Sequence, residues 1–296
     1  MPISGGAGGE GGGAGSDLAD AETSGMAGAA GDSPTDAATN NPPDATDSAS
    51  PIDAAPETGC PNPTACALRA ALVHRYMFDG TGTVATDSIG SANGTIMNAT
   101  LTGTGSLVLA GGTTDQFVDL PNGIIKSLTN ATFEVWLTWS GGGNWQRIFD
   151  FGNPDTNIEG AQSAGSSTLH MTPLADGLHV LRFAFKRSDQ TVAQETDLEA
   201  TMPLASGVVV HVAGVIDDTN NMMYLYRDGA VQGSKAFTDS LSLLTDINNW
   251  LGRSQYAGDP ELGATLHEFR IYKAALSAAQ IQASFAAGQN PAYLMK

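Results

Sequence analysis

Thr132-Phe133-Glu134-Val135-Trp136-Leu137-Thr138-Trp139 alternates strictly between two faces of one strand. Its odd-numbered side chains are all apolar, whereas Glu134, Trp136 and Thr138 form a more polar set. Because successive side chains of a β-strand point to opposite faces, the first set predicts a buried face. The glycine-rich turn at 141–144 and a second run at 146–151 complete a predicted hairpin.

Outward from this hairpin, short runs of the same kind extend from Leu72 to Tyr272, separated by clusters of Gly, Asn, Asp and Ser. About twelve such strands are predicted, with Asp228-Gly229 as one hairpin turn. One helix is predicted, at 277–285, where Ser277 and Gln280 have capping-box spacing and Gly288 can end the helix. Strands without alternating helices predict an all-β, two-sheet antiparallel sandwich with a short C-terminal helix.

The first 59 residues have a different composition. They contain ten Asp and Glu but no Lys, Arg, Phe, Trp, Tyr or Cys, and they are rich in Gly, Ala, Ser and Pro. Such a segment buries too little apolar surface to offset the entropy of ordering it. The sequence therefore predicts a disordered acidic linker at 1–59, a junction at 60–67 and one folded domain at 68–296.

Charge and hydropathy exclude several kinds of partner. The net charge of −18, without a basic stripe, argues against nucleic acid and against anionic lipid. No apolar run approaches the roughly 20 residues that span a bilayer, and the start lacks a secretory signal. The Gly- and Ser-rich start resembles the segment that follows the lipid-modified cysteine of bacterial envelope lipoproteins. We therefore expect an extracellular or envelope protein whose native start lies upstream of Met1.

Two cysteines, Cys60 and Cys66, flank the junction. A disulfide between them is sterically feasible and is the favoured prediction for a chain outside the cytoplasm. Free or metal-linked thiols are the alternative. A zinc site is weakly supported, because no cluster of histidines accompanies the two cysteines.

The domain resembles the laminin-G-like jelly roll of the concanavalin A-like lectin/glucanase superfamily in a set of motifs that occur in the family's order. Together they cover nearly all of 68–288. They are residues 74–80, 87–90 with Asn93-Gly94, 131–136, 147–152, 211–213, 224–229 and 266–277. The ordered set is specific for the fold, but a fold hosts many functions.

The resemblance implies a structural calcium ion where the first strand, the following loop and the last strand meet. Asp79, Asp87, Asn93 and Glu268 are the predicted ligands, because calcium prefers carboxylate and carbonyl oxygens. The pair His267-Glu268 departs from the two acids that family members often carry there. In the alternative interpretation, Asp79 and Asp87 are turn residues.

Glycan binding is the favoured function. Sugar sites combine aromatic surfaces with polar groups that fix orientation, and Trp145, Tyr256, Trp136 and Arg253 are the predicted ligand-binding residues. Trp145 and Tyr256 lie in polar loops, and Arg253 lies beside Tyr256 in sequence. In the alternative interpretation, Trp145 covers the edge of the core and Trp136 is packed inside.

No catalytic residues are predicted. Glucanases of this fold pair carboxylates on one strand, and the nearest run, at 195–199, is interpreted as an exposed acidic loop. We expect a non-enzymatic module that binds a glycan or a surface partner. A structural or adhesive protein without a sugar site is the main alternative, and an unrecognised polysaccharide hydrolase or lyase is a third.

Overall fold

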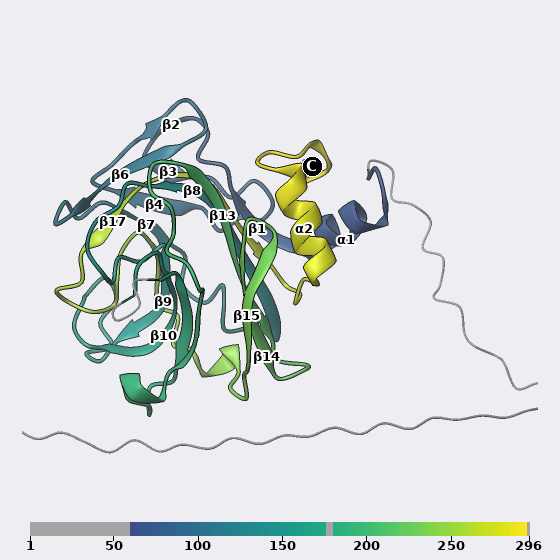
Figure 1. Ribbon diagram of the computed structural model, residues 1–296. Helices are drawn as coiled ribbons and strands as arrows, with labels where there is room; N and C mark the ends of the chain where they lie inside the picture. The colour runs from purple at the N-terminus through teal and green to yellow at the C-terminus, as the bar shows by residue number, and fades with distance from the viewer. Residues whose placement is uncertain (1–59, 176–179, 295–296) are drawn as a thin grey trace, which may run out of the picture. The chain divides into compact units, whose positions relative to one another are not determined.

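The computed structural model describes residues 60–175 and 180–294, which fall within one compact unit. The linker predicted at 1–59 lies outside the described residues. The predicted antiparallel sandwich is confirmed: two sheets face each other across the core, and two α-helices lie against the outer face of one of them (Figure 1).

The larger sheet has nine strands and places β8 (Asn130–Trp139), the strand with the strict alternation, at its centre. Its order is β15 (Ala230–Ala236), β14 (Met222–Arg227), β13 (Val209–Asp217), β8, β17 (Glu261–Tyr272), β6 (Leu107–Gly112), β5 (Leu101–Thr102) and β2 (Thr81–Gly82), with β1 (Leu72–Tyr76) paired to β17. All of these pairings are antiparallel.

The smaller sheet has eight strands and carries the pocket described below. Its order is β12 (Thr196–Glu199), β11 (Arg182–Lys186), β10 (Gly165–Thr172), β9 (Phe149–Pro154), β16 (Asn248–Leu251), β7 (Phe117–Leu120), β4 (Gly94–Met97) and β3 (Val84–Ala85). Short 3-10 helices lie at η1 (Val192–Gln194), η2 (Leu241–Leu243) and η3 (Ala292–Leu294).

The core lies between the sheets and uses the predicted apolar face of β8. Phe133 is fully buried, with ring centroids of Phe149 and Phe151 on β9 at 5.5 and 5.6 Å. Burying an aromatic side chain of this size contributes about 1.5–3 kcal/mol. The alternation at 132–139 therefore predicted correctly which side chains of β8 face inward.

Helices α1 (Pro63–Ala71) and α2 (Ala278–Ala287) cover the outer face of the nine-stranded sheet. Leu68 and Ile281 pack there against Val215 and Tyr272. The predicted helix is confirmed as α2, including the Ser277 capping box and Gly288 at its end.

Helix α1 was not predicted, and it occupies most of the segment that was assigned as a junction. Its start is encoded locally: the Asn62 side chain accepts a hydrogen bond from the Ala65 N–H at 2.9 Å, and Pro63 follows at a position where a missing N–H costs nothing. The short helix then gains its stability by burying Leu68.

The outer face of the eight-stranded sheet carries a row of polar and aromatic residues in cross-strand register. The paired positions from β12 to β7 are Asp197, Ala184, His170, Asp150, Trp250 and Asp119. The segments at 155–164 and 253–259 fold over part of this row, where Gly160 donates to Asn248 and Arg253 donates to Gln162. The remaining part of the face forms an open pocket.

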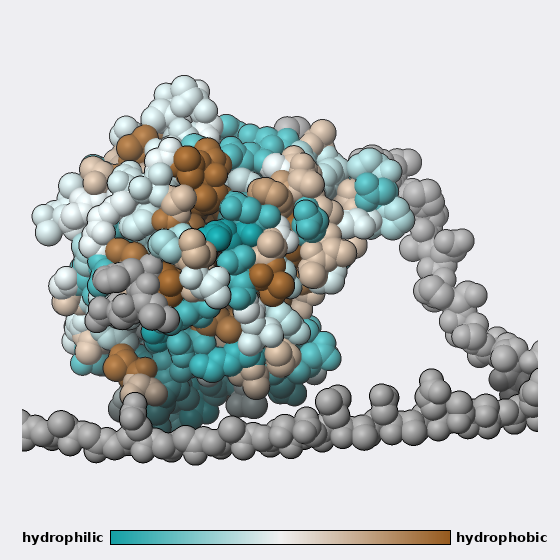
Figure 2. All heavy atoms as spheres, viewed as in Figure 1, coloured by the Kyte–Doolittle hydropathy of each residue, from teal (hydrophilic) through white to brown (hydrophobic). Residues whose placement is uncertain are grey.

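The surface viewed in Figure 2 shows apolar residues in small separate groups among hydrophilic ones. Within the described residues, no helix combines the length and hydropathy that crossing a bilayer requires.

Candidate functional site

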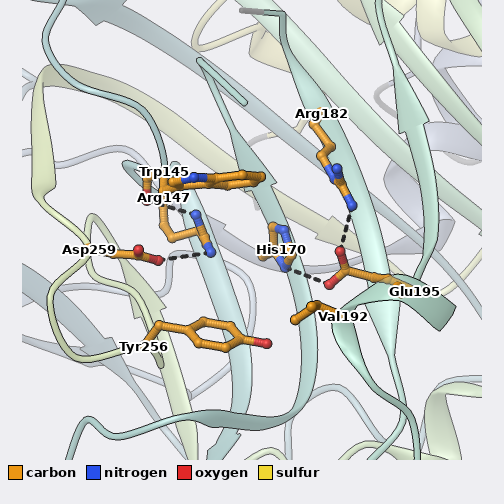
Figure 3. A pocket seen from close by; sticks show the side chains of 9 residues that line it. Trp145, Arg147, His170, Arg182, Val192, Glu195, Tyr256 and Asp259 are labelled. Carbon is orange, nitrogen blue, oxygen red and sulfur yellow. Dashed lines mark hydrogen bonds and ion pairs between the residues drawn. The ribbon is translucent and has the colours of Figure 1, made fainter. Parts of the chain in front are cut away.

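The pocket has a volume of about 370 Å³ and lies against the outer face of β9, β10 and β11. The loop before β9, the loop after β16 and the segment around η1 before β12 supply the other lining residues (Figure 3). Its lining consists of Trp145, Arg147, His170, Arg182, Val192, Ala193, Glu195, Tyr256 and Asp259.

Two aromatic rings flank the pocket. Trp145 lies in the β8–β9 loop and Tyr256 in the loop after β16, and the Arg147 guanidinium lies between them, 5.6 and 6.0 Å from the two ring centroids (Figure 3). The Trp145 backbone has φ +69°, a left-handed conformation that is rare for a bulky side chain. A hydrogen bond from its N–H to the Leu174 carbonyl, at 2.9 Å, helps to hold this conformation. Such strain persists only where the surroundings enforce it, and it concentrates at functional sites.

Two arginines reach the pocket, and each is paired with carboxylates. Arg147 Nη2 lies 3.0 Å from Asp259, and its Nη1 donates to the Trp145 carbonyl at 2.7 Å. Arg182 Nη2 lies 2.6 Å from Glu195, and the Arg182 guanidinium lies 5.7 Å from the centroid of the Trp145 ring. The pocket therefore presents paired rather than isolated charges.

Burial shifts the pKa values of His170 and Glu195, which line the pocket, and of Asp150, which lies beside Arg147. It raises the pKa of Asp150 to about 7, against the lowering effect of Arg147. It also raises the pKa of Glu195, which Arg182 opposes. Burial and the positive charges of Arg147 and Arg182 hold the pKa of His170 well below its ordinary value, so this imidazole is neutral near pH 7.

Several buried polar atoms around the pocket lack a hydrogen-bond partner within the described residues. They are Nε of Arg182, Nε2 of His170, the Tyr256 hydroxyl and Oδ1 of Asp150. Nε of Arg147 and Nδ1 of His170 make no hydrogen bond either, but they lie 3.4 Å from Asp150 and 3.9 Å from Glu195. Leaving one such group unsatisfied costs about 1–3 kcal/mol, and buried groups of this kind are rare in folded proteins. Their concentration around one cavity indicates a place where water or a ligand supplies the missing hydrogen bonds.

Of the four predicted ligand-binding residues, the structure brings Trp145 and Tyr256 together in the pocket. Arg253 lies outside it, with its guanidinium 4.5 Å from the Phe117 ring centroid and 4.7 Å from that of Trp250. Trp136 lies on the other sheet and is 3% exposed, packed against His211 and Arg270. It is therefore too deeply buried to contact a ligand.

Five charged or titratable residues of the pocket were not predicted as ligand-binding: Arg147, His170, Arg182, Glu195 and Asp259. The run at 195–199 is not an exposed loop as interpreted, because residues 196–199 form β12 and the Glu195 side chain is only 6% exposed beside Arg182. His170 and Arg182 alternate with apolar residues on β10 and β11. This alternation predicts that both side chains point away from the core, but it does not predict which residues they contact.

The four predicted calcium ligands do not form one set: Asp87 and Asn93 lie together, whereas Asp79 and Glu268 lie in other surroundings. Both oxygens of Asp87 accept hydrogen bonds, from the N–H groups of Arg75, Ile89, Gly90 and Ala92 and from His74 at 2.8 Å. The Asn93 side-chain oxygen accepts from the Asp87 N–H at 2.9 Å, and Asp79 is exposed. Although burial opposes it, these hydrogen bonds hold the pKa of Asp87 well below its ordinary value.

Glu268 is engaged by two guanidiniums instead. Arg75 Nε and Arg270 Nε each lie 2.6 Å from its Oε1, and the Asn290 N–H donates to its Oε2 at 2.7 Å. Because calcium needs several free oxygen ligands and would be repelled by the two arginines, this set of residues does not fit the ion.

Cys60 lies just before α1 and Cys66 within its first turns. The structure contains no bond between their sulfur atoms. Their pairing therefore stays a prediction.

Comparisons with known proteins agree with this architecture. No curated protein matches the sequence. Among solved structures, domain 4 of the extracellular arabinanase AbnA from Geobacillus stearothermophilus, in complex with arabinotriose, has a TM-score of 0.54 at 19% identity, covering 72% of this chain and 97% of that domain.

The ligand-binding domain of botulinum neurotoxin serotype D, in complex with N-acetylneuraminic acid, has a TM-score of 0.56 at 13% identity, covering 76% of this chain and 53% of that one. A Trypanosoma rangeli sialidase has a TM-score of 0.55 at 13% identity over 74% of this chain and 33% of its own length. At these identities the likeness establishes the fold. The family model described as "Concanavalin A-like lectin/glucanases superfamily" matches residues 111–282, more than half of the sequence, and the chain therefore belongs to this superfamily.

Proposed function

We propose that the domain is a glycan-binding module whose ligand occupies the pocket between Trp145 and Tyr256. The observation that carries the proposal is the combination of two flanking aromatic rings with buried polar atoms that lack partners within the described residues. Aromatic faces pack against the apolar C–H faces of a sugar ring, and the polar atoms can exchange hydrogen bonds with its hydroxyl groups.

The proposal is supported by the ligands of structures that share the fold. The Geobacillus stearothermophilus domain was solved with arabinotriose and the neurotoxin domain with N-acetylneuraminic acid. Both ligands are carbohydrates. Because a shared fold alone does not define a ligand, the support for this chain comes chiefly from its own pocket.

The proposed activity is binding without turnover. The Glu195 carboxylate is held by Arg182 at 2.6 Å, and the Asp259 carboxylate is held by Arg147 at 3.0 Å. Carboxylates held in ion pairs serve poorly as the proton donor and nucleophile that glycoside hydrolysis needs. Calcium has no place in the proposal, because the predicted ligand set does not fit the ion.

We further propose that the module acts outside the cytoplasm, in the extracellular space or the cell envelope. The acidic composition of residues 1–59, which is typical of a linker, supports this location. Detection of the native protein in the envelope or culture-medium fraction would agree with the proposal, and recovery from the cytosol alone would contradict it.

A glycan array followed by calorimetry on the best ligand tests the binding function. We expect Trp145→Ala and Tyr256→Ala each to weaken binding at least about fivefold, since stacking against an aromatic ring contributes on the order of 1 kcal/mol or more. Val231→Ala, at an exposed position on β15, is the matched control and should leave affinity unchanged.

Two outcomes would contradict the proposal. One is the absence of binding to any glycan, which would favour an adhesive role without a sugar site. The other is turnover of a polysaccharide by the purified protein at a rate that depends on pocket residues.

A further inference from the structure

We infer that the pocket selects neutral sugars and discriminates against sugars that carry a carboxylate. This inference rests on the proposed glycan-binding function and specifies its ligand class. It follows from the pairing of charges in the pocket: both arginines that line it already face carboxylates, so an acidic sugar would have to compete with these carboxylates for either cation.

Arg147 is enclosed on several sides. Its Nη2 lies 3.0 Å from Asp259, its Nε lies 3.4 Å from Asp150, and its Nη1 donates to the Trp145 carbonyl. The side chain is 3% exposed. A carboxylate on a ligand would have to displace Asp259 to form a bidentate ion pair with this guanidinium. It would also come within a few ångströms of the negative charge of Asp259 or Asp150.

Arg182 is surrounded by three acidic side chains. Glu195 lies 2.6 Å from Nη2, Glu199 lies 3.3 Å from Nη1, and Asp197 lies 3.8 Å from Nη2. Lys235 also pairs with Asp197, at 3.1 Å, but is half exposed at the edge of the sheet. The surroundings of Arg182 therefore carry at least as much negative as positive charge and repel an anion.

The other polar groups of the pocket are uncharged or already occupied. His170 is neutral near pH 7, and the Tyr256 hydroxyl is un-ionised because burial raises its pKa. The buried Lys186 ammonium donates to the carbonyls of Gly165 and Ser166. Neutral hydrogen-bonding groups beside aromatic faces complement hydroxyl-bearing sugars.

Glycan pairs that differ only in CH₂OH or COO⁻ at one ring carbon, such as glucoside and glucuronide oligosaccharides, test the inference. For pairs whose neutral member binds, we expect the acidic member to bind at least about tenfold more weakly at pH 7.5, because like charges placed side by side are strongly unfavourable. The ratio of the two dissociation constants is the readout.

Glu195→Gln provides the sharper test, because it keeps the side-chain shape and removes the negative charge from Arg182. We expect it to reduce the ratio at least about threefold by improving acidic-sugar binding, and Asp259→Asn to act likewise through Arg147. Asp239→Asn is the control: this buried acid pairs with Arg187 at 2.8 Å, outside the pocket lining, and should leave the ratio unchanged.

Tighter binding of acidic members by the wild-type protein would overturn the inference, provided that the binding is lost in Trp145→Ala. An unchanged ratio in folded samples of both Glu195→Gln and Asp259→Asn would overturn it as well. The complete absence of glycan binding would instead overturn the proposed function.

Discussion

The guanidinium carbon of Arg270 lies 4.2 Å from the centroid of the Trp136 ring, in the interior beneath α2. The same side chain pairs with Glu268 at 2.6 Å and with Glu134 at 3.5 Å, and it donates to the Ser284 hydroxyl and the Gly288 carbonyl. This fully buried cation thus pairs with both buried carboxylates, of which Glu268 also pairs with Arg75, and it fastens the C-terminal helix to the sheet.

Replacing Arg270 should therefore be strongly destabilising. In Arg270→Met, Glu134 and Glu268 lose a shared positive charge in the interior, and we expect the free energy of unfolding to fall by about 3–5 kcal/mol. Urea denaturation measures the loss. Arg227→Met, at a partly exposed position on β14, should cost less than about 1 kcal/mol. A similar small loss for Arg270→Met would show that the network contributes little.

The pH dependence of stability should carry the signature of Asp150. Its pKa in the folded protein is raised from 3.8 to about 7 by burial. The folded state thus holds a proton that the unfolded state releases, so this group's stabilising contribution is lost as pH rises from about 4 to about 7.

Asp150→Asn should remove that contribution, and its stability relative to the wild type should rise between pH 5 and pH 8. Thermal unfolding of both proteins across this range gives the difference directly. Taking the difference also cancels the opposite contribution of His170, whose lowered pKa reduces stability on the acidic side. A difference that does not vary with pH would contradict the assignment.

Calcium should have no effect on the fold. The carboxylate oxygens of Asp87 and Glu268 already interact with backbone N–H groups, a histidine and two arginines. Neither carboxylate is therefore available to the ion. We expect the melting temperature in millimolar CaCl₂ and in EDTA to agree within about 1 °C. A clear upward shift of the melting temperature with CaCl₂ would contradict this expectation and would show that the folded protein binds calcium.

Trp145 should be dispensable for stability although it is required for binding. Its φ of +69° costs a bulky residue on the order of 1–3 kcal/mol, whereas Asn tolerates this conformation. In Trp145→Asn the relief of strain should offset the lost packing of a partly exposed ring, leaving the free energy of unfolding within about 1 kcal/mol of the wild type. Glycan affinity should fall to background. Retained glycan affinity, or a fall of more than about 2 kcal/mol in the free energy of unfolding, would contradict the prediction that Trp145 serves binding and not stability.

The fold was largely predictable because its signals are local. The alternation at 132–139, the capping box at Ser277 and Gln280, and the Asp228-Gly229 turn each act over a few residues, and each is found as predicted. Helix α1 is also encoded locally, by Asn62 and Pro63, but its single buried leucine gives little periodic signal.

The pocket was only partly predictable because it depends on register between distant strands. Trp145 and Tyr256 could be chosen as aromatic residues in polar loops. His170 and Arg182 come together because β10 and β11 are neighbouring strands in which Thr172 pairs with Arg182. Strand β12 pairs with the other edge of β11, and this pairing brings Glu195, the residue before β12, close to Arg182. Trp136 was misplaced for a related reason: its polar strand face is covered by α2, which begins 142 positions later in the sequence.

Helix α1 brings the chain into the domain across the outer face of the nine-stranded sheet (Figure 1). The pocket opens on the outer face of the eight-stranded sheet. The point of entry and the binding pocket thus lie back to back, with the whole core between them. Attachment to a bead or sensor chip through the chain upstream of Cys60 leaves the pocket facing the solution.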